Sequence, residues 1–157
     1  MAVPVNAIRF GGALAVAQVG AGNVVDARNG TVLLGGLAYP LGLASAGAVL
    51  YVSDRGTGVV WAVGPGGAVR LASGLSSPEG LAVDGGRLLV VEEGRDRVVA
   101  INLATRAVTT VIEGLDLGSR VVPAALPHFV FNGVAVGSDG SIYVTADGAN
   151  AVYRFRR

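Results

Sequence analysis

The sequence has 157 residues, of which 52% are hydrophobic and 15% charged, and 25 of them are glycine. This composition suits one compact sheet protein with many tight turns, and it excludes a disordered chain. The net charge of +1, the even scatter of its charges and the absence of cysteine exclude a nucleic-acid footprint, disulfides and thiolate chemistry.

The sequence also argues against a membrane or secreted protein. No apolar run reaches the roughly 18–20 residues that cross a bilayer, because Gly, Arg and Asp interrupt each one. The opening MAVPVNAIRF has neither the basic nor the continuous apolar region of a secretory signal. We therefore expect a cytoplasmic protein with no membrane contact.

Four repeats of short apolar runs follow one another along the chain. They cover residues 5–35, 36–73, 74–113 and 131–157, and each run of four to seven residues ends at Gly or charged turn residues. The third is the fullest, with the runs GLAVD, RLLVVE, RVVAINL and VTTVIE. Four consecutive antiparallel strands in about 40 residues are typical of one β-propeller blade. The sequence thus predicts an all-β propeller that forms a single domain over residues 1–157.

The fourth repeat ends after three strands, so the closure of the ring is open to three interpretations. The chain could form a four-blade ring in which residues 1–5 supply the missing strand, or it could be a fragment of a larger propeller. It could also be a half ring that closes by head-to-tail dimerisation. Closure is needed because an open ring leaves a blade face and strand edges uncovered, and we favour the dimer because most propellers with this blade pattern have more than four blades.

An insertion at residues 116–130 separates the third and fourth blades. It contains Pro123, Pro127 and the single histidine, His128. Long loops in compact folds often carry binding residues. A specificity loop and a plain surface excursion are both compatible with this segment.

The innermost strands of a propeller line its axis, so equivalent positions point at one central site. The residues preceding the Gly or Ala of these strands are Asn6, Leu41, Glu79 and Asn132, and the second strands are expected to end at Gln18, Asp54, Glu93 and Asp147. Amide and carboxylate oxygens suit Ca²⁺, with Mg²⁺ or Mn²⁺ as alternatives. The same side chains could instead cap turns and bind neighbouring backbone.

Some of these residues carry a family resemblance. Asn132-Gly133-Val134, Ser138-Asp139-Gly140, Ile142-Tyr143-Val144 and Asp147 resemble the signature of the gluconolactonase/regucalcin-like propellers, a family related in fold to the paraoxonases and the NHL-repeat proteins. Pro78-Glu79-Gly80-Leu81 and Leu50-Tyr51-Val52-Ser53-Asp54 fit the same superfamily.

The resemblance implies a divalent cation held by Asn132 and Asp147, with Glu79 and Asn6 as the further ligands. It also implies Asp147 as a base, and a paraoxonase-like site would use His128 as a general base. That family has about six blades and this chain has four, so its ligand ring would be incomplete or completed by a second subunit.

Two functions are compatible with these residues. The first is a Ca²⁺-dependent hydrolase that acts on a small lactone or ester at the central mouth. The second is a non-catalytic NHL-like scaffold that binds a protein or a small ligand there. In both, a homodimer is the expected assembly, and a half-propeller without activity of its own is the remaining alternative.

Overall fold

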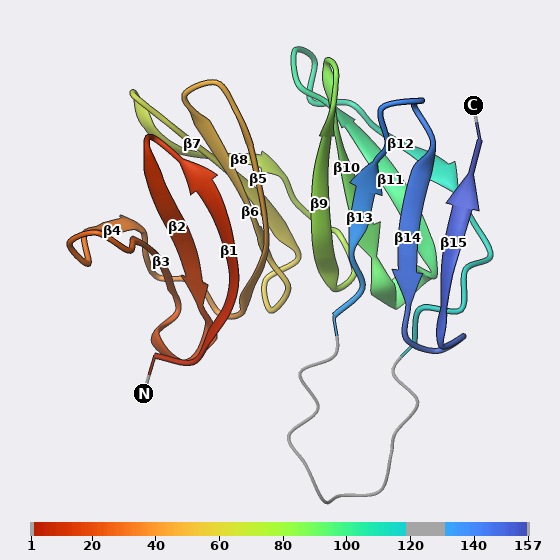
Figure 1. Ribbon diagram of the computed structural model, residues 1–157, viewed down its shortest axis with the longest axis horizontal. Helices are drawn as coiled ribbons and strands as arrows, with labels where there is room; N and C mark the ends of the chain where they lie inside the picture. Colours follow the sequence, from red (N-terminus) through yellow and green to blue (C-terminus); the bar gives the residue numbers. More distant parts are fainter. Residues whose placement is uncertain (1, 119–130, 157) are drawn as a thin grey trace, which may run out of the picture.

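The fold is a four-blade β-propeller, as predicted. The computed structural model describes residues 2–118 and 131–156, which form four antiparallel sheets and two single-turn 3-10 helices (Figure 1). Three sheets have four strands and the last has three, in agreement with the sequence pattern. None of the described segments is a helix with the length and apolar character of a membrane span.

Each blade is a meander whose strands pair in chain order. Blade 1 contains β1 (Pro4–Phe10), β2 (Ala13–Gln18), η1 (Val19–Ala21), β3 (Asn23–Asp26) and β4 (Val32–Leu34). Blade 2 contains β5 (Pro40–Ala46), β6 (Val49–Asp54), β7 (Val59–Gly64) and β8 (Gly67–Ala72). Blade 3 contains β9 (Pro78–Asp84), β10 (Arg87–Glu92), η2 (Glu93–Arg95), β11 (Arg97–Asn102) and β12 (Val108–Ile112). Blade 4 contains β13 (Val134–Val136), β14 (Ile142–Ala146) and β15 (Ala151–Phe155).

The strand register makes the blades equivalent residue by residue. A proline opens the innermost strand of the first three blades and pairs with the last residue of the second strand, in the pairs Pro4↔Gln18, Pro40↔Asp54 and Pro78↔Glu92. An irregularity in the pairing follows each proline. Glu92 therefore ends the second strand of blade 3, and our alignment of Glu93 with Asp54 was wrong by one residue. Asp147 likewise follows the end of β14 instead of ending it.

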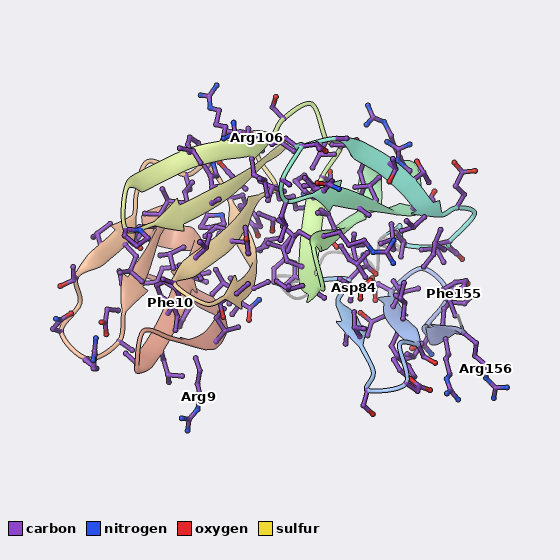
Figure 2. The ribbon with its side chains drawn as sticks, turned by 90° about the horizontal axis from the view of Figure 1, so that it is seen from above. Arg9, Phe10, Asp84, Arg106, Phe155 and Arg156 are labelled. Carbon is purple, nitrogen blue, oxygen red and sulfur yellow. The ribbon has the colours of Figure 1, made fainter. Side chains whose placement is uncertain are left out.

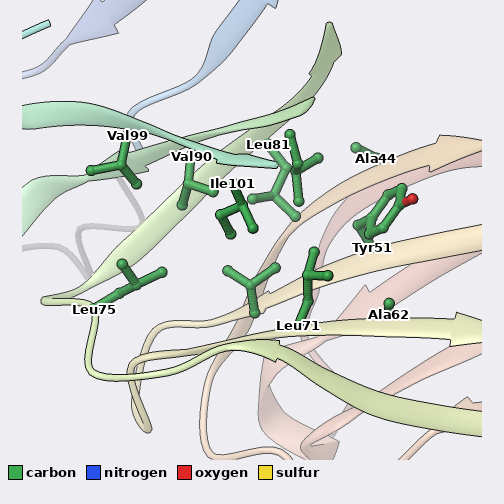
Figure 3. Close-up of a cluster of buried hydrophobic side chains, with 11 residues drawn as sticks. Ala44, Tyr51, Ala62, Leu71, Leu75, Leu81, Val90, Val99 and Ile101 are labelled. Carbon is green, nitrogen blue, oxygen red and sulfur yellow. The ribbon is translucent and has the colours of Figure 1, made fainter. Parts of the chain in front are cut away.

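The hydrophobic core lies between the blades. Alternating side chains on both faces of blades 2 and 3 are buried, which gives one apolar cluster at each of the three blade junctions. Figure 3 shows the junction of blades 2 and 3, where Tyr51 and Leu71 lie near Leu81, Val90 and Ile101. Packing of this kind positions the innermost strands side by side.

The four blades form an arch that is open on one side (Figure 2). The innermost strands contact in the order β1, β5, β9 and β13, but β13 and β1 share no comparable contact within residues 2–118 and 131–156. Among the strands of the described residues, the third strand of blade 4, β15, pairs only with β14. The chain therefore does not close a four-blade ring with a strand from residues 1–5. Most of the insertion at 116–130, including His128, lies outside the described residues.

Candidate functional site

The innermost strands converge on one cavity at the centre of the arch. Its volume is about 290 Å³, and it is lined by Val5, Asn6, Leu41, Gly42, Glu79, Gly80, Phe131, Asn132 and Gly133. The four side chains predicted to share a central site, Asn6, Leu41, Glu79 and Asn132, thus lie around the same cavity.

Their register differs from the expected one in blade 1. The pairing of Pro4 with Gln18 makes Val5, and not Asn6, the equivalent of Leu41 and Glu79. Asn6 takes the place of the glycine in blades 2 and 3, and its Nδ2 donates to the Leu41 carbonyl oxygen at 3.1 Å. The side chain of Asn6 therefore joins blade 1 to blade 2.

Glu79 is the central polar residue of the site. Its side chain is 3% exposed, and both carboxylate oxygens accept hydrogen bonds from neighbouring blades. Oε1 accepts from Nε of Arg55 at 3.1 Å. Oε2 accepts from the backbone N–H and from Nδ2 of Asn132, both at 2.8 Å. One carboxylate thereby links blades 2, 3 and 4, as expected for a buried charge that is stable only when paired.

Asn132 uses all of its polar side-chain atoms in this network. Besides its bond to Glu79, Nδ2 donates to the Leu117 carbonyl oxygen at 3.1 Å, and Oδ1 accepts from the backbone N–H of Asp147 at 2.9 Å. The guanidinium of Arg55 also reaches Oε2 of Glu93 at 3.2 Å. Asn132 therefore fixes the chain that enters β13 and the turn that follows β14.

Arg55 is a site residue that the sequence patterns did not single out. It occupies the position directly after the second strand of blade 2, where blade 3 has Glu93 and blade 4 has Asp147. Opposite charges at this position in neighbouring blades were the signal that could have revealed it.

The charge state of Glu79 couples the site to pH. Burial raises the pKa of Glu79 above its ordinary value of 4.5, against the hydrogen bonds from Asn132 and the positive charge of Arg55, which lower it. The folded protein then holds this proton more tightly than the unfolded chain does. The contribution of Glu79 to stability is greatest below pH 4.5 and falls as the pH rises from 4.5 through the folded-state pKa.

We therefore expect the free energy of unfolding of wild type, minus that of Glu79→Gln, to fall with rising pH over this window and then to level off. Urea unfolding of both proteins from about pH 4 to 8 measures the difference. A difference that increases with pH would show that the bonds from Arg55 and Asn132 outweigh burial.

The donor set does not fit a divalent cation as it is arranged. Calcium takes about six to eight oxygen ligands, whereas the oxygens of Glu79 and Asn132 already accept from N–H donors and a guanidinium lies beside them. No group of three or more His, Cys, Asp or Glu side chains with metal-binding geometry occurs in the described residues. The cation assignment stays a sequence-based prediction, and calcium titration tests it.

Asp147 lies apart from this network except through its backbone. Its carboxylate makes no hydrogen bond or ion pair with any residue in the described ranges, and the residue is partly exposed. Asp147 lines a second cavity of about 340 Å³ on blade 4, together with Phe131, Thr145, Ala146, Asn150, Ala151 and Val152.

Comparisons with known proteins identify the fold. No protein-family model matches the chain. No curated protein matches it either. Among solved structures, virginiamycin B lyase from Staphylococcus aureus is similar with a TM-score of 0.65 and 15% identity, over 98% of this chain and 55% of that one. A presumed gluconolactonase is similar with a TM-score of 0.65 and 21% identity, over 91% of this chain and 57% of that one. A chain of a nidogen/laminin complex is similar with a TM-score of 0.69 and 16% identity, over 91% of this chain and 56% of that one.

These similarities establish a shared propeller fold between this chain, two proteins named as enzymes and one binding complex. The chain spans about half the length of each of them. At these identities the likeness shows the fold alone, so the activities of those proteins enter only as candidates.

Proposed function

We propose that this chain is a non-catalytic binding scaffold whose ligand enters the central mouth of the propeller. The observation that supports this proposal is that Glu79, Arg55 and Asn132 hydrogen-bond three blades to one another. A carboxylate that is saturated by structural partners is not available as a base, a nucleophile or a metal ligand. The polar residues at the mouth then serve mainly to hold its shape.

The cavity indicates the kind of ligand that fits. Val5, Leu41 and Phe131 contribute apolar walls, Asn6 contributes an amide, and three glycines leave backbone close to the space. A volume of about 290 Å³ takes a small molecule with an apolar body and a few polar groups, or one side chain of a partner protein. The nidogen/laminin complex shows a chain of similar fold within a protein assembly.

A second candidate is the divalent-metal-dependent lactonase or esterase. The carboxylate of Asp147, which has no hydrogen-bond or ion-pair partner among residues 2–118 and 131–156, lies beside the 340 Å³ cavity and favours this candidate, as does the likeness to a presumed gluconolactonase. In this candidate Asp147 would be the base and a ligand, with Asn132, Glu79 and Asn6 completing the Ca²⁺ site. The bonds between Glu79 and Asn132 would first have to break.

Calcium titration and a lactone assay separate the two functions. The scaffold proposal predicts no heat of binding at millimolar Ca²⁺, and no lactone or ester hydrolysis above the Asp147→Asn control. The calorimetric and hydrolysis measurements are repeated with Mg²⁺, Mn²⁺ and a chelator. Saturable binding of one ion per chain, with hydrolysis that chelator and Asp147→Asn both abolish, would replace the scaffold by the hydrolase.

Direct evidence for the scaffold comes from ligand screening in the presence of chelator. A set of small polar compounds is tested for a rise in melting temperature of wild type and of Asn6→Trp, whose indole would fill the central cavity. Compounds that bind at the mouth should stabilise wild type and have no effect on the filled variant.

A further inference from the structure

The two end blades each have one face that no other blade covers. Every blade has a rear face toward the preceding blade and a forward face toward the following one. Within the described residues nothing packs behind blade 1 or in front of blade 4, and these two blades flank the open side of the arch (Figure 2). Both uncovered faces exist whatever binds at the central mouth, so what they do is independent of the proposed function.

One valine on the forward face of blade 4 repeats a feature of the forward faces inside the chain. The register places one valine of each third strand at the same point on this face, opposite Ala17, Ser53, Val91 and Thr145. These valines are 0%, 0%, 0% and 64% exposed, in the order Val24, Val60, Val98 and Val152. The first three are buried at blade junctions, so the exposure of Val152 marks a junction without its second blade.

The rear face of blade 1 shows the same pattern. Each second strand has an aliphatic residue at the equivalent position of its rear face. These residues are Leu14, Leu50, Leu88 and Ile142. Their exposed fractions are 47%, 0%, 0% and 6% in that order. Val32, which pairs with Val25 on the same face, is 54% exposed. Leu14 is thus a junction residue that lacks the preceding blade.

A half-completed hydrogen-bond relay points to the same missing neighbour. At the junction of blades 2 and 3, the Gly42 N–H donates to Ser53 Oγ at 2.7 Å, and this hydroxyl donates onward to the Glu79 carbonyl oxygen of the next blade at 2.6 Å. In blade 4 the Gly133 N–H donates to Thr145 Oγ1 at 2.6 Å. No onward acceptor for the Thr145 hydroxyl is found in residues 2–118 or 131–156.

The register identifies the acceptor that would complete this relay. Glu79 is equivalent to Val5 of blade 1, so the Val5 carbonyl of another first blade would stand where the Thr145 hydroxyl points. Gly133 also leaves room for that strand, since a Cβ there would meet only Thr145 Oγ1, at 3.4 Å. At Gly42 and Gly80 the same space is taken by the next blade.

We propose that two copies of this chain close one eight-blade ring, in which the forward face of blade 4 docks on the rear face of blade 1 of the other copy. The contact occurs twice about a two-fold axis along the central channel. Val152 and Leu14 become buried in it, as their counterparts are inside the chain, and the Thr145 hydroxyl donates to the Val5 carbonyl of the other copy. Eight blades lie within the range of known propellers.

The test is the mass of the full chain in solution, measured by light scattering and sedimentation equilibrium. Wild type should have twice the chain mass. Val152→Arg and Leu14→Asp should each give monomers, with a dissociation constant raised roughly 1,000-fold, because each dimer contains the altered contact twice. Val108→Asp is the matched control: Val108 is 42% exposed on the outer strand of blade 3, and its replacement should leave the dimer intact.

Mixing the two variants tests the forward-on-rear geometry. A mixed dimer of Val152→Arg and Leu14→Asp has one unaltered contact and one that brings opposite charges to facing surfaces, so dimers should reappear in the mixture. A monomeric wild type at high concentration would overturn the proposal. Loss of the dimer with Val152→Arg but not with Leu14→Asp would also overturn it, because blade 4 would then contact blade 4. Circular dichroism of each monomer confirms that the variant is folded.

Discussion

Replacing Gly42 with alanine is expected to destabilise the protein by about 3 kcal/mol, at the upper end of the range for overpacking. A Cβ at Gly42 would fall well inside contact distance of the Glu79 carbonyl oxygen and 2.7 Å from Ser53 Oγ. Both atoms belong to the junction of blades 2 and 3, and Ser53 Oγ also accepts from the Gly42 N–H. The methyl group can be accommodated only if the innermost strands separate, which opens the apolar cluster behind them.

Gly86→Ala is the matched control for this substitution. Gly86 lies in the turn between β9 and β10, a Cβ there would meet nothing within 4 Å, and its φ is not in the left-handed region. Its replacement should change the free energy of unfolding by less than about 1 kcal/mol. Urea denaturation at one protein concentration measures both variants. Equal effects of the two would show that the close approach of β5 and β9 is not needed for stability.

The blades could be predicted from the sequence because their determinants are local. Glycine and charged turn residues separate the apolar runs, and alternating apolar residues define two buried faces. The number of strands can therefore be read from the sequence. Asn6 was placed one residue out of register, because it stands where blades 2 and 3 have the glycine that was used to align the innermost strands. Glu92 was missed for a related reason: it is the last residue of β10, and the 3-10 turn begins only at Glu93.

The roles of the polar residues depend on contacts between blades, which no local pattern specifies. Asp54 was aligned with possible ligands, yet its carboxylate accepts from the backbone N–H groups of Ala38 and Tyr39, at 3.1 and 2.7 Å. Glu92 accepts in the same way from the Ser76 N–H at 2.7 Å. Both residues hold the connection that enters their own blade from the preceding one. The open arch has the same origin, because the rotation between neighbouring blades is set by side-chain packing over the whole junction.

Removing the carboxylate of Glu79 is expected to cost about 3–5 kcal/mol in Glu79→Ala, the usual range for breaking a buried pair. The substitution removes the acceptor of the Asn132 backbone N–H and one of the two acceptors of its side-chain amide, and it leaves the Arg55 guanidinium without one of its two partners. Glu79→Gln keeps a side-chain oxygen for Asn132 and should therefore lose less stability than Glu79→Ala. Arg55→Ala should also lose less, because Arg55 is 35% exposed and Glu79 retains its bonds from Asn132.

A double-mutant cycle of Glu79→Ala and Arg55→Ala then decides what Glu79 does at the mouth. If the network is structural, the two losses should be less than additive, because the double variant no longer buries an unpaired charge. Glu113→Ala, an exposed carboxylate outside the network, should have little effect. If Glu79→Ala instead left stability unchanged, the carboxylate would be retained at the mouth for something other than blade packing, and the metal-dependent hydrolase would become the better account of the site.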